Sequence, residues 1–361
     1  MKKDVCIFLF FLGAIHSFCY GDCDILLMKN KGNKVKSIGM IGEGAWGIAV
    51  ASLLAENGYH VSLWCCEKDV AQQINQEHKN NRYMPGYELS PHIVAHVDLK
   101  DVACHDWVFI STPTKFFRDV VTKCKPYYRM NQRWVILSKG IENETLMLPS
   151  QILEHVLSPR IHYAVLSGPS FAHGVMDKSV TGVNIAAVDH SIAEDVAILV
   201  RNAWFRPFVI DDVLGTQLGG ALKNVVAFLM GIVNGLDGSD NTRAFLFTRA
   251  WQEMCALSRA LGAQEKTLFD LAGLGDLFLT ASGGTSRNFA VGKLFGRGYA
   301  LTRILDETGF TPEGLNTIKT VQDLIRKYDL VLPLSQQLYK VIFKGQSASS
   351  LIDVVAHESA L

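Results

Sequence analysis

Short apolar runs alternate with helical patterns along the first half of the chain. The apolar runs lie at residues 35–41, 60–64, 107–113, 134–142, 163–172 and 184–188, and each predicts a strand. A helical pattern covers residues 48–56, and Ser191-Ile192-Ala193-Glu194 is interpreted as a capping box that opens another helix. Strands and helices that alternate in this way predict an α/β fold with a parallel, doubly wound sheet.

The pattern changes after about Asp212, where strand-like runs almost disappear and helical periodicity takes over. Helices are predicted at residues 218–235, 242–261, 288–295, 315–327 and 334–343, with Gly262 as the stop of the second. The second half of the chain is therefore expected to be all-helical.

The first of these helices is apolar on most of its surface, which is typical of a core helix. Lys223 and Asn224 nevertheless lie in it, one turn after Gly219-Gly220. A buried ammonium needs a partner, and burial lowers its pKa, which suits a lysine that moves protons near neutral pH. The alternative is that the side chain extends along the helix edge into water; this helix alone leaves both readings open.

A glycine-rich turn, Gly42-Glu43-Gly44-Ala45-Trp46-Gly47, joins the first strand to the first helix. Strand, GxGxxG, helix and strand within about 30 residues form a dinucleotide-binding βαβ unit. Gly42 permits the tight turn, Gly44 admits the pyrophosphate to the backbone N–H groups, and Gly47 lets helix and strand pack closely.

The acidic residue expected about 20 positions later is Glu67, which follows Cys65-Cys66 and precedes Lys68. Glu67 is suited to the ribose 2′-hydroxyl of NAD, whereas Lys68 is suited to the 2′-phosphate of NADP. The choice of cofactor stays open at this point.

Composition leaves the predicted fold unchanged and mainly excludes some classes of partner. The chain is 48% hydrophobic and 19% charged, and its 35 basic residues balance 35 acidic ones, which argues against a nucleic-acid partner. The eight cysteines show neither a CxxC pair nor zinc spacing, so most are interpreted as small buried residues in a reducing compartment. No metal site is expected.

Residues 1–30 resemble a leader: Met1-Lys2-Lys3 precedes an apolar stretch that has the length of a secretory signal rather than of a membrane span. No convincing cleavage site follows, and Met28 is an alternative start. We expect a dispensable extension on a cytoplasmic protein, without stable membrane insertion. The domains are predicted at 31–212, a Rossmann-type dinucleotide-binding domain, and at 213–361, a helical substrate domain.

Three further groups are candidates for chemistry. Lys139 lies just past the carboxyl end of a predicted strand, where open parallel sheets bind their ligands. Asp276, within a glycine-rich turn, is a suitable carboxylate partner for Lys223. The stretch from Gly283-Gly284-Thr285 to Ser286-Arg287-Asn288 combines glycines, a hydroxyl and a guanidinium at a helix start, as an anion site does. The alternatives without a chemical role are, in the same order, a solvated loop lysine, a helix-capping aspartate and an ordinary polar loop.

Taken together, the motifs resemble NAD(P)-dependent glycerol-3-phosphate dehydrogenase of the bacterial type, from about Lys36 to Leu351. The matching motifs, in chain order, are GEGAWG at 42–47, NNRYMPG at 80–86, SKGIE at 138–142, SGPSFA at 167–172, GALKN at 220–224, GLGDL at 273–277 and SRN at 286–288.

The resemblance implies that the chain interconverts dihydroxyacetone phosphate and sn-glycerol 3-phosphate for phospholipid synthesis, with NAD or NADP as cofactor and a homodimer as one expected assembly. It assigns acid–base catalysis to Lys223, helped by Asp276 and Lys139. The implied substrate residues are Lys139, Gly168, Ser170, Lys223, Asp276, Ser286, Arg287 and Asn288. The implied cofactor residues are Gly42, Gly44, Ala45, Trp46, Gly47, Glu67, Lys139, Ala172, Arg287, Thr311 and Glu313.

The chain departs from this family at Cys66, where a basic residue is usual, at Pro312, and in its leader. Two other functions remain open: a 2-hydroxyacid or ketopantoate-type reductase, which shares the two-domain plan, and a nucleotide sensor without turnover. The Ser286-Arg287-Asn288 cradle favours the dehydrogenase over the first, and the Lys223–Asp276 pair argues against the second.

Overall fold

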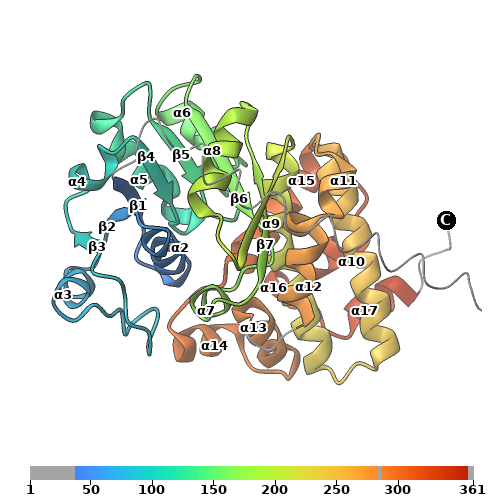
Figure 1. Cartoon of the computed structure of the whole chain (residues 1–361). Coiled ribbons are helices and arrows are strands. Elements are labelled where there is room, and N and C mark those ends of the chain that lie inside the picture. Colours follow the sequence, from blue (N-terminus) through green and yellow to red (C-terminus); the bar gives the residue numbers. More distant parts are fainter. Residues whose placement is uncertain (1–36, 283–285, 357–361) are drawn as a thin grey trace, which may run out of the picture. The chain divides into compact units, whose positions relative to one another are not determined.

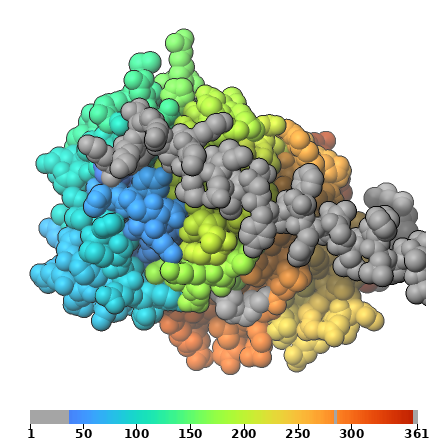
Figure 2. Space-filling model, in the orientation of Figure 1, coloured from blue at the N-terminus to red at the C-terminus, as the bar shows by residue number. Residues whose placement is uncertain are grey.

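A computed structural model describes residues 37–282 and 286–356 of the chain. The expected leader at 1–30 and the first three residues of the expected anion site, Gly283, Gly284 and Thr285, lie outside these ranges. Figure 2 shows the surface of the strand-rich region, from blue to green, adjoining the orange and yellow surface of the helical region.

Eight strands form one sheet in the order β3-β2-β1-β4-β5-β6-β7-β8 (Figure 1). They are β1 (Ser37–Ile41), β2 (His60–Trp64), β3 (Ile93–His96), β4 (Trp107–Ile110), β5 (Arg133–Ile136), β6 (His162–Ser167), β7 (Thr181–Ala186) and β8 (Phe205–Ile210). The neighbours from β3 to β6 all pair in parallel, which confirms the predicted sheet. β7 instead runs antiparallel to β6, and β8 follows the direction of β7.

The helices of the strand-rich region are α2 (Ala45–Glu56), α3 (Lys68–Glu77), α4 (Lys100–Ala103), α5 (Thr114–Cys124), the 3₁₀ turn η1 (Lys125–Tyr127), α6 (Pro149–Val156), α7 (Ala172–Met176) and α8 (His190–Val200). The predicted capping box of α8 is wrong. Asp189 is the N-cap, and its carboxylate accepts the N–H of Ser191 at 3.0 Å. An aspartate side chain two residues earlier reaches the free N–H groups first.

The described residues after Asp212 contain helices and no strand, as predicted. These are α9 (Val213–Gly235), α10 (Asp240–Ala260), α11 (Glu265–Leu268), the π-helical turn η2 (Leu271–Gly275), α12 (Asp276–Ser282), α13 (Arg287–Gly296), α14 (Leu301–Thr308), α15 (Glu313–Lys327), α16 (Pro333–Phe343) and α17 (Ser350–Ala356).

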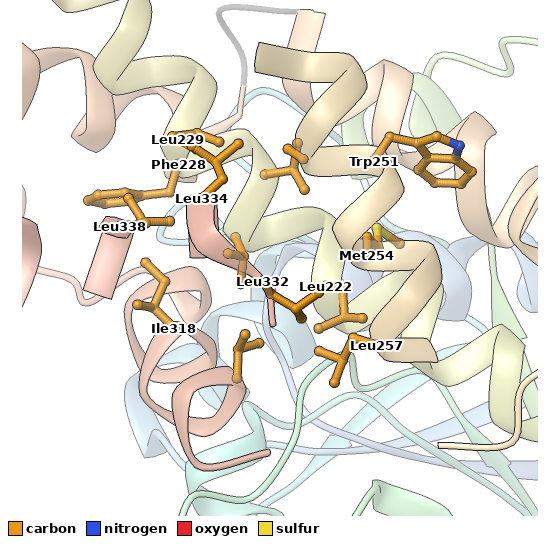
Figure 3. Close-up of a cluster of buried hydrophobic side chains, with 14 of the residues drawn as sticks. Leu222, Phe228, Leu229, Trp251, Met254, Leu257, Ile318, Leu332, Leu334 and Leu338 are labelled. Atoms are coloured by element: carbon orange, nitrogen blue, oxygen red, sulfur yellow. The ribbon is translucent and has the colours of Figure 1, made fainter. Parts of the chain in front are cut away.

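Helix α9 is the central element of the helical region, and α10, α12, α13 and α15 all pack against it. Figure 3 shows Leu222, Phe228 and Leu229 of α9 among side chains from α10, α15 and α16. Almost every residue of this helix is buried, which confirms the expected core helix. Among the described helices, α9 alone is long and apolar enough to cross a membrane, and 89% of its apolar window is buried inside the protein.

Helices α9 and α13 cross in close backbone contact through glycines spaced four apart on each helix. These are Gly231 and Gly235 on α9, and Gly292 and Gly296 on α13. A Cβ atom added at Gly292 would lie 2.2 Å from the carbonyl oxygen of Phe228, and one added at Gly231 would lie 2.2 Å from that of Phe289. Side chains at these positions would force the helices apart. The crossing therefore holds the N-terminus of α13, with Ser286 and Arg287, beside α9.

Candidate active site

The glycine-rich turn lies where the strand order reverses. From β1 the chain continues outward to β2 and β3, and then returns to place β4 on the other side of β1. In open α/β sheets, ligands bind in the crevice at the carboxyl ends of such neighbouring strands. The turn from Gly42 to Gly47 occupies this edge, between β1 and the N-terminus of α2.

The turn has the room and the donors that a pyrophosphate needs. A Cβ at Gly47 would lie 2.1 Å from the carbonyl oxygen of Gly42, so helix and turn touch as the fingerprint requires. A Cβ at Gly44 would meet nothing within 4 Å, and no side chain caps α2, which begins at Ala45. The indole N–H of Trp46 is buried without a partner. These residues fit a dinucleotide cofactor.

Two carboxylates lie at the end of β2. Glu67, the predicted ribose ligand, accepts a hydrogen bond from the Tyr83 hydroxyl at 3.1 Å and pairs with Arg82 at 3.1 Å. The second carboxylate belongs to Glu43, which sequence reasoning did not single out. Its Oε1 accepts the N–H of Cys66 at 2.9 Å and that of Glu67 at 3.2 Å. Burial raises the pKa of Glu43, while these two N–H groups favour the ionised form.

Lys223, Asp276 and Lys139 meet at the carboxyl end of β5. Lys223 comes from α9, Asp276 from the start of α12, and Lys139 from the segment that follows β5. One carboxylate oxygen of Asp276 bonds Lys223, and the other accepts from Lys139 at 2.6 Å. Lys223 is 7% exposed and Asp276 1%, so the alternative of a lysine extending into water is wrong.

Burial lowers the pKa of Lys223, the attraction of Asp276 opposes this, and the nearby Lys139 ammonium lowers it as well, so that the net pKa is about 8. A lysine that titrates near neutral pH can both give and take a proton. The position of Asp276 is itself supported by a π-helical turn, η2, that directly precedes it; such turns are frequent at functional sites.

Asn184 of β7 fixes this turn, and sequence reasoning did not identify it. Its side-chain oxygen accepts the N–H of Ala272 at 2.7 Å, and its amide donates to Asp270 at 3.1 Å. Asn184 is fully buried between two apolar residues of its strand, so an amide side chain at that position was the available signal. The last, reversed part of the sheet thus supports the helical region at the site.

The residues of the predicted phosphate cradle that the structure describes lie at the start of α13. Ser286 is the N-cap and accepts the N–H of Phe289 at 3.3 Å. The guanidinium of Arg287 lies over the ring of Phe310, 5.1 Å from its centre. The Asn288 amide donates to Asn224 at 3.0 Å and accepts the N–H of Gly314 at 2.9 Å, so it joins α13 to α9 and α15.

The exit of β6 brings its predicted residues near Lys139, whose ammonium donates to the Gly168 carbonyl at 3.3 Å; Ser170 bonds the same carbonyl at 3.0 Å. Ala172 begins the short helix α7.

Glu313 begins α15 and accepts the N–H of Thr114, at the exit of β4, at 3.2 Å. Burial raises the pKa of Glu313. Thr311 is exposed and makes no contact to the other site residues in the hydrogen bonds described.

Known proteins are similar to this chain in sequence and in fold. Residues 37–193 match the family of NAD-dependent glycerol-3-phosphate dehydrogenase N-termini, and residues 212–353 match the family of the corresponding C-termini. A glycerol-3-phosphate dehydrogenase [NAD(P)+] of Bacillus velezensis is 37% identical over 322 residues, which span 88% of this chain and 93% of that one.

Solved structures agree with the sequence relatives. The crystal structure of glycerol-3-phosphate dehydrogenase from Coxiella burnetii matches with a TM-score of 0.86 at 31% identity, over 90% of this chain and all of that one. A ketopantoate reductase of Ralstonia eutropha matches with a TM-score of 0.57 at 16% identity, over 89% of this chain and 100% of that one, which shows a shared fold alone. With both family halves matched in order around one lysine–aspartate–lysine site, the chain belongs to the NAD-dependent glycerol-3-phosphate dehydrogenase family.

Proposed function

We propose that this protein transfers hydride reversibly between NAD(P)H and dihydroxyacetone phosphate, giving sn-glycerol 3-phosphate for phospholipid synthesis. Family membership supports the reaction class. The observation that carries the proposal is the buried Lys223, which shares the Asp276 carboxylate with Lys139. A cation held there is suited to a carbonyl oxygen on which negative charge develops.

Gly42, Gly44 and Gly47, with Ala45 and Trp46, would hold the cofactor at the switch point of the sheet, and Glu67 would bind its ribose. Bound NAD(P)H supplies the hydride. Lys223 gives a proton to the substrate oxygen during reduction and takes it back during oxidation, while Asp276 keeps its ammonium in place. Lys139 adds positive charge beside the same oxygen.

Arg287, Ser286 and Asn288 are proposed to bind the substrate phosphate. A guanidinium can hold a phosphate through two parallel hydrogen bonds, and the N-terminus of α13 presents further N–H groups. Gly168 and Ser170 would contact the substrate from the β6 side. Binding energy from the phosphate then helps to hold the carbonyl in position for reaction.

The proposal is tested by following oxidation of NADH and NADPH with dihydroxyacetone phosphate and, separately, with ketopantoate. We expect turnover with the first substrate and none with the second. Turnover with ketopantoate alone would establish the other reductase, and cofactor binding without any turnover would establish a sensor.

The role of Lys223 is tested by Lys223→Met, which keeps the length of the side chain and removes its charge. We expect kcat to fall by on the order of 100-fold or more, as loss of a positioned acid does. Asp276 keeps its bond to Lys139, so the variant should still fold, with a melting temperature lowered by the loss of one partner of a buried ion pair. Lys266→Met, on the short helix α11, is the matched control and should keep full activity. Near-normal turnover of Lys223→Met would overturn the role.

We also propose that the enzyme is cytoplasmic and dimeric and does not need residues 1–27. The family matches begin at residue 37, which supports the last of these statements, while the first two rest on the resemblance to the family. The chain is expressed in cells from Met1 and from Met28. Fractionation of the cells tests the location, and export of the longer chain would refute a cytoplasmic enzyme. The mass and activity of each purified product test the dimer and the need for the leader.

A further inference from the structure

Glu43 occupies the turn position between Gly42 and Gly44, and its side chain reaches away from the turn to the end of β2. There it accepts the backbone N–H groups of Cys66 and Glu67, the second and third residues after the strand, and it is 7% exposed. In this fold, the residues that follow β2 contact the 2′-position of the adenosine ribose. The carboxylate therefore lies at the part of the site that distinguishes the two nicotinamide cofactors.

A second segment holds Glu43 in this place. The side-chain amide of Asn80 donates to the Glu43 carbonyl at 3.0 Å, and its oxygen accepts the N–H of Tyr83 at 3.0 Å. Asn80 is fully buried, so this link is protected from water. The Tyr83 hydroxyl then bonds Glu67. The 80–83 segment thus fixes both carboxylates relative to the turn.

The two cofactors make opposite demands on such a site. A ribose 2′-hydroxyl can donate a hydrogen bond to a carboxylate, whereas a 2′-phosphate needs N–H donors and cations. Both N–H groups at the end of β2 already bond Glu43, and Glu67 adds a second negative charge. A 2′-phosphate would find these donors already occupied and would face like charges, both of which weaken its binding.

We propose that Glu43 is a specificity-determining residue, and that it makes this enzyme select NADH over NADPH. The inference rests on the proposed use of a nicotinamide cofactor and narrows it to one of the two. The opposing groups are the exposed Lys68, which begins α3, and Arg82, whose guanidinium pairs with Glu67 and whose side chain is more than half exposed. Release of Arg82 from Glu67 toward a 2′-phosphate is the competing arrangement, and it predicts the opposite preference.

The test measures cofactor binding without substrate, so that it does not depend on turnover. Dissociation constants for NADH and NADPH are determined by calorimetry for the wild type, Glu43→Ala and the control Glu77→Ala. Glu77 ends helix α3 and bonds Gln73, so its removal changes the charge of the same region without changing the turn.

We expect the wild type and Glu77→Ala to bind NADH at least tenfold more tightly than NADPH. Glu43→Ala should reduce this ratio by on the order of tenfold, because it frees two N–H donors and removes one charge. A wild type that binds both equally, or prefers NADPH, overturns the proposal, as does an unchanged ratio in Glu43→Ala.

Glu43→Gln serves if the alanine variant does not fold, because it keeps the size of the side chain and an oxygen that can accept the same N–H groups. Loss of the charge alone should still reduce the ratio, and an unchanged ratio overturns the proposal here too. Adenosine 2′-monophosphate and 5′-monophosphate give a second readout on the wild type, with the 2′-compound expected to be the weaker ligand. Failure to reduce dihydroxyacetone phosphate, with the expected binding ratio intact, would instead count against the proposed reaction.

Discussion

The charge on Lys223 depends on its neighbours from two elements. Asp276 of α12 stabilises the ammonium, while Lys139, after β5, and the loss of water destabilise it, and the pKa falls to about 8. The folded pKa lies below that of an unfolded lysine, so the ammonium is lost as the pH rises through about 8. In the proposed mechanism, reduction needs the protonated side chain of Lys223 and oxidation needs the neutral one.

We therefore expect opposite pH profiles for the two directions. The kcat for reduction of dihydroxyacetone phosphate should fall as the pH rises through about 8, and that for oxidation of sn-glycerol 3-phosphate should rise through the same region. Initial rates at saturating substrate, from about pH 6 to 10, measure both. Parallel profiles in the two directions would contradict the assignment of the proton to Lys223.

Single residues differed in how far the sequence revealed them. Lys223 could be predicted because a charge in an apolar helix requires a partner, and the glycine-flanked Asp276 offered one. Glu43 could not, because its carboxylate bonds amides more than 20 residues away, and the motif assigns no role to that position. Asn184 was missed for the same reason: its partners, Asp270 and Ala272, lie at the start of η2, far along the chain.

At the scale of elements, the crossing of α9 and α13 supports a prediction. Gly292→Ala adds a methyl group 2.2 Å from the Phe228 carbonyl, so the backbones must separate. We expect a loss of about 1–3 kcal/mol in the free energy of unfolding, as overpacking causes, although alanine is the better helix former. Because α13 begins at Arg287, the KM for dihydroxyacetone phosphate should rise as well.

The matched control is Gly174→Ala in α7, where the nearest atom to an added Cβ is 4.0 Å away. It should leave the stability unchanged or raise it slightly, since only helix propensity changes. Urea unfolding and substrate titration of both variants test the prediction. Equal stability of Gly292→Ala and the wild type would show that the helices can separate freely.

Element boundaries followed the sequence where the pattern was regular. The strand predicted at 60–64 is β2, and the helices α9, α10, α13, α15 and α16 lie where periodicity placed them. The direction of β7 could not be predicted, because an apolar run carries no sign of which way it pairs. The edge strand β8 was missed because Pro207 interrupts its pattern, and proline is tolerated at an edge.

On the scale of the whole molecule, cofactor binding should stabilise the native state. At a concentration of about 100 times its dissociation constant, NADH should add about 2.7 kcal/mol to the free energy of unfolding. Thermal unfolding with and without NADH measures this as a rise in melting temperature. Gly44→Asp is the control: the Cβ meets nothing, so the free protein should melt normally, but a carboxylate at the pyrophosphate turn should abolish the rise. A full rise in that variant would place the cofactor elsewhere.

The sharing of Asp276 by Lys139 and Lys223 leaves two ammonium groups with one carboxylate. Before substrate arrives, this corner of the protein therefore attracts any small oxyanion in the solution. Sulfate or inorganic phosphate in an assay buffer will act as a competitor, and will compete less well in alkaline buffers, where Lys223 has lost its proton. The chloride salt of an amine buffer is the appropriate medium in which to measure the true affinity of this enzyme for its phosphorylated ketone.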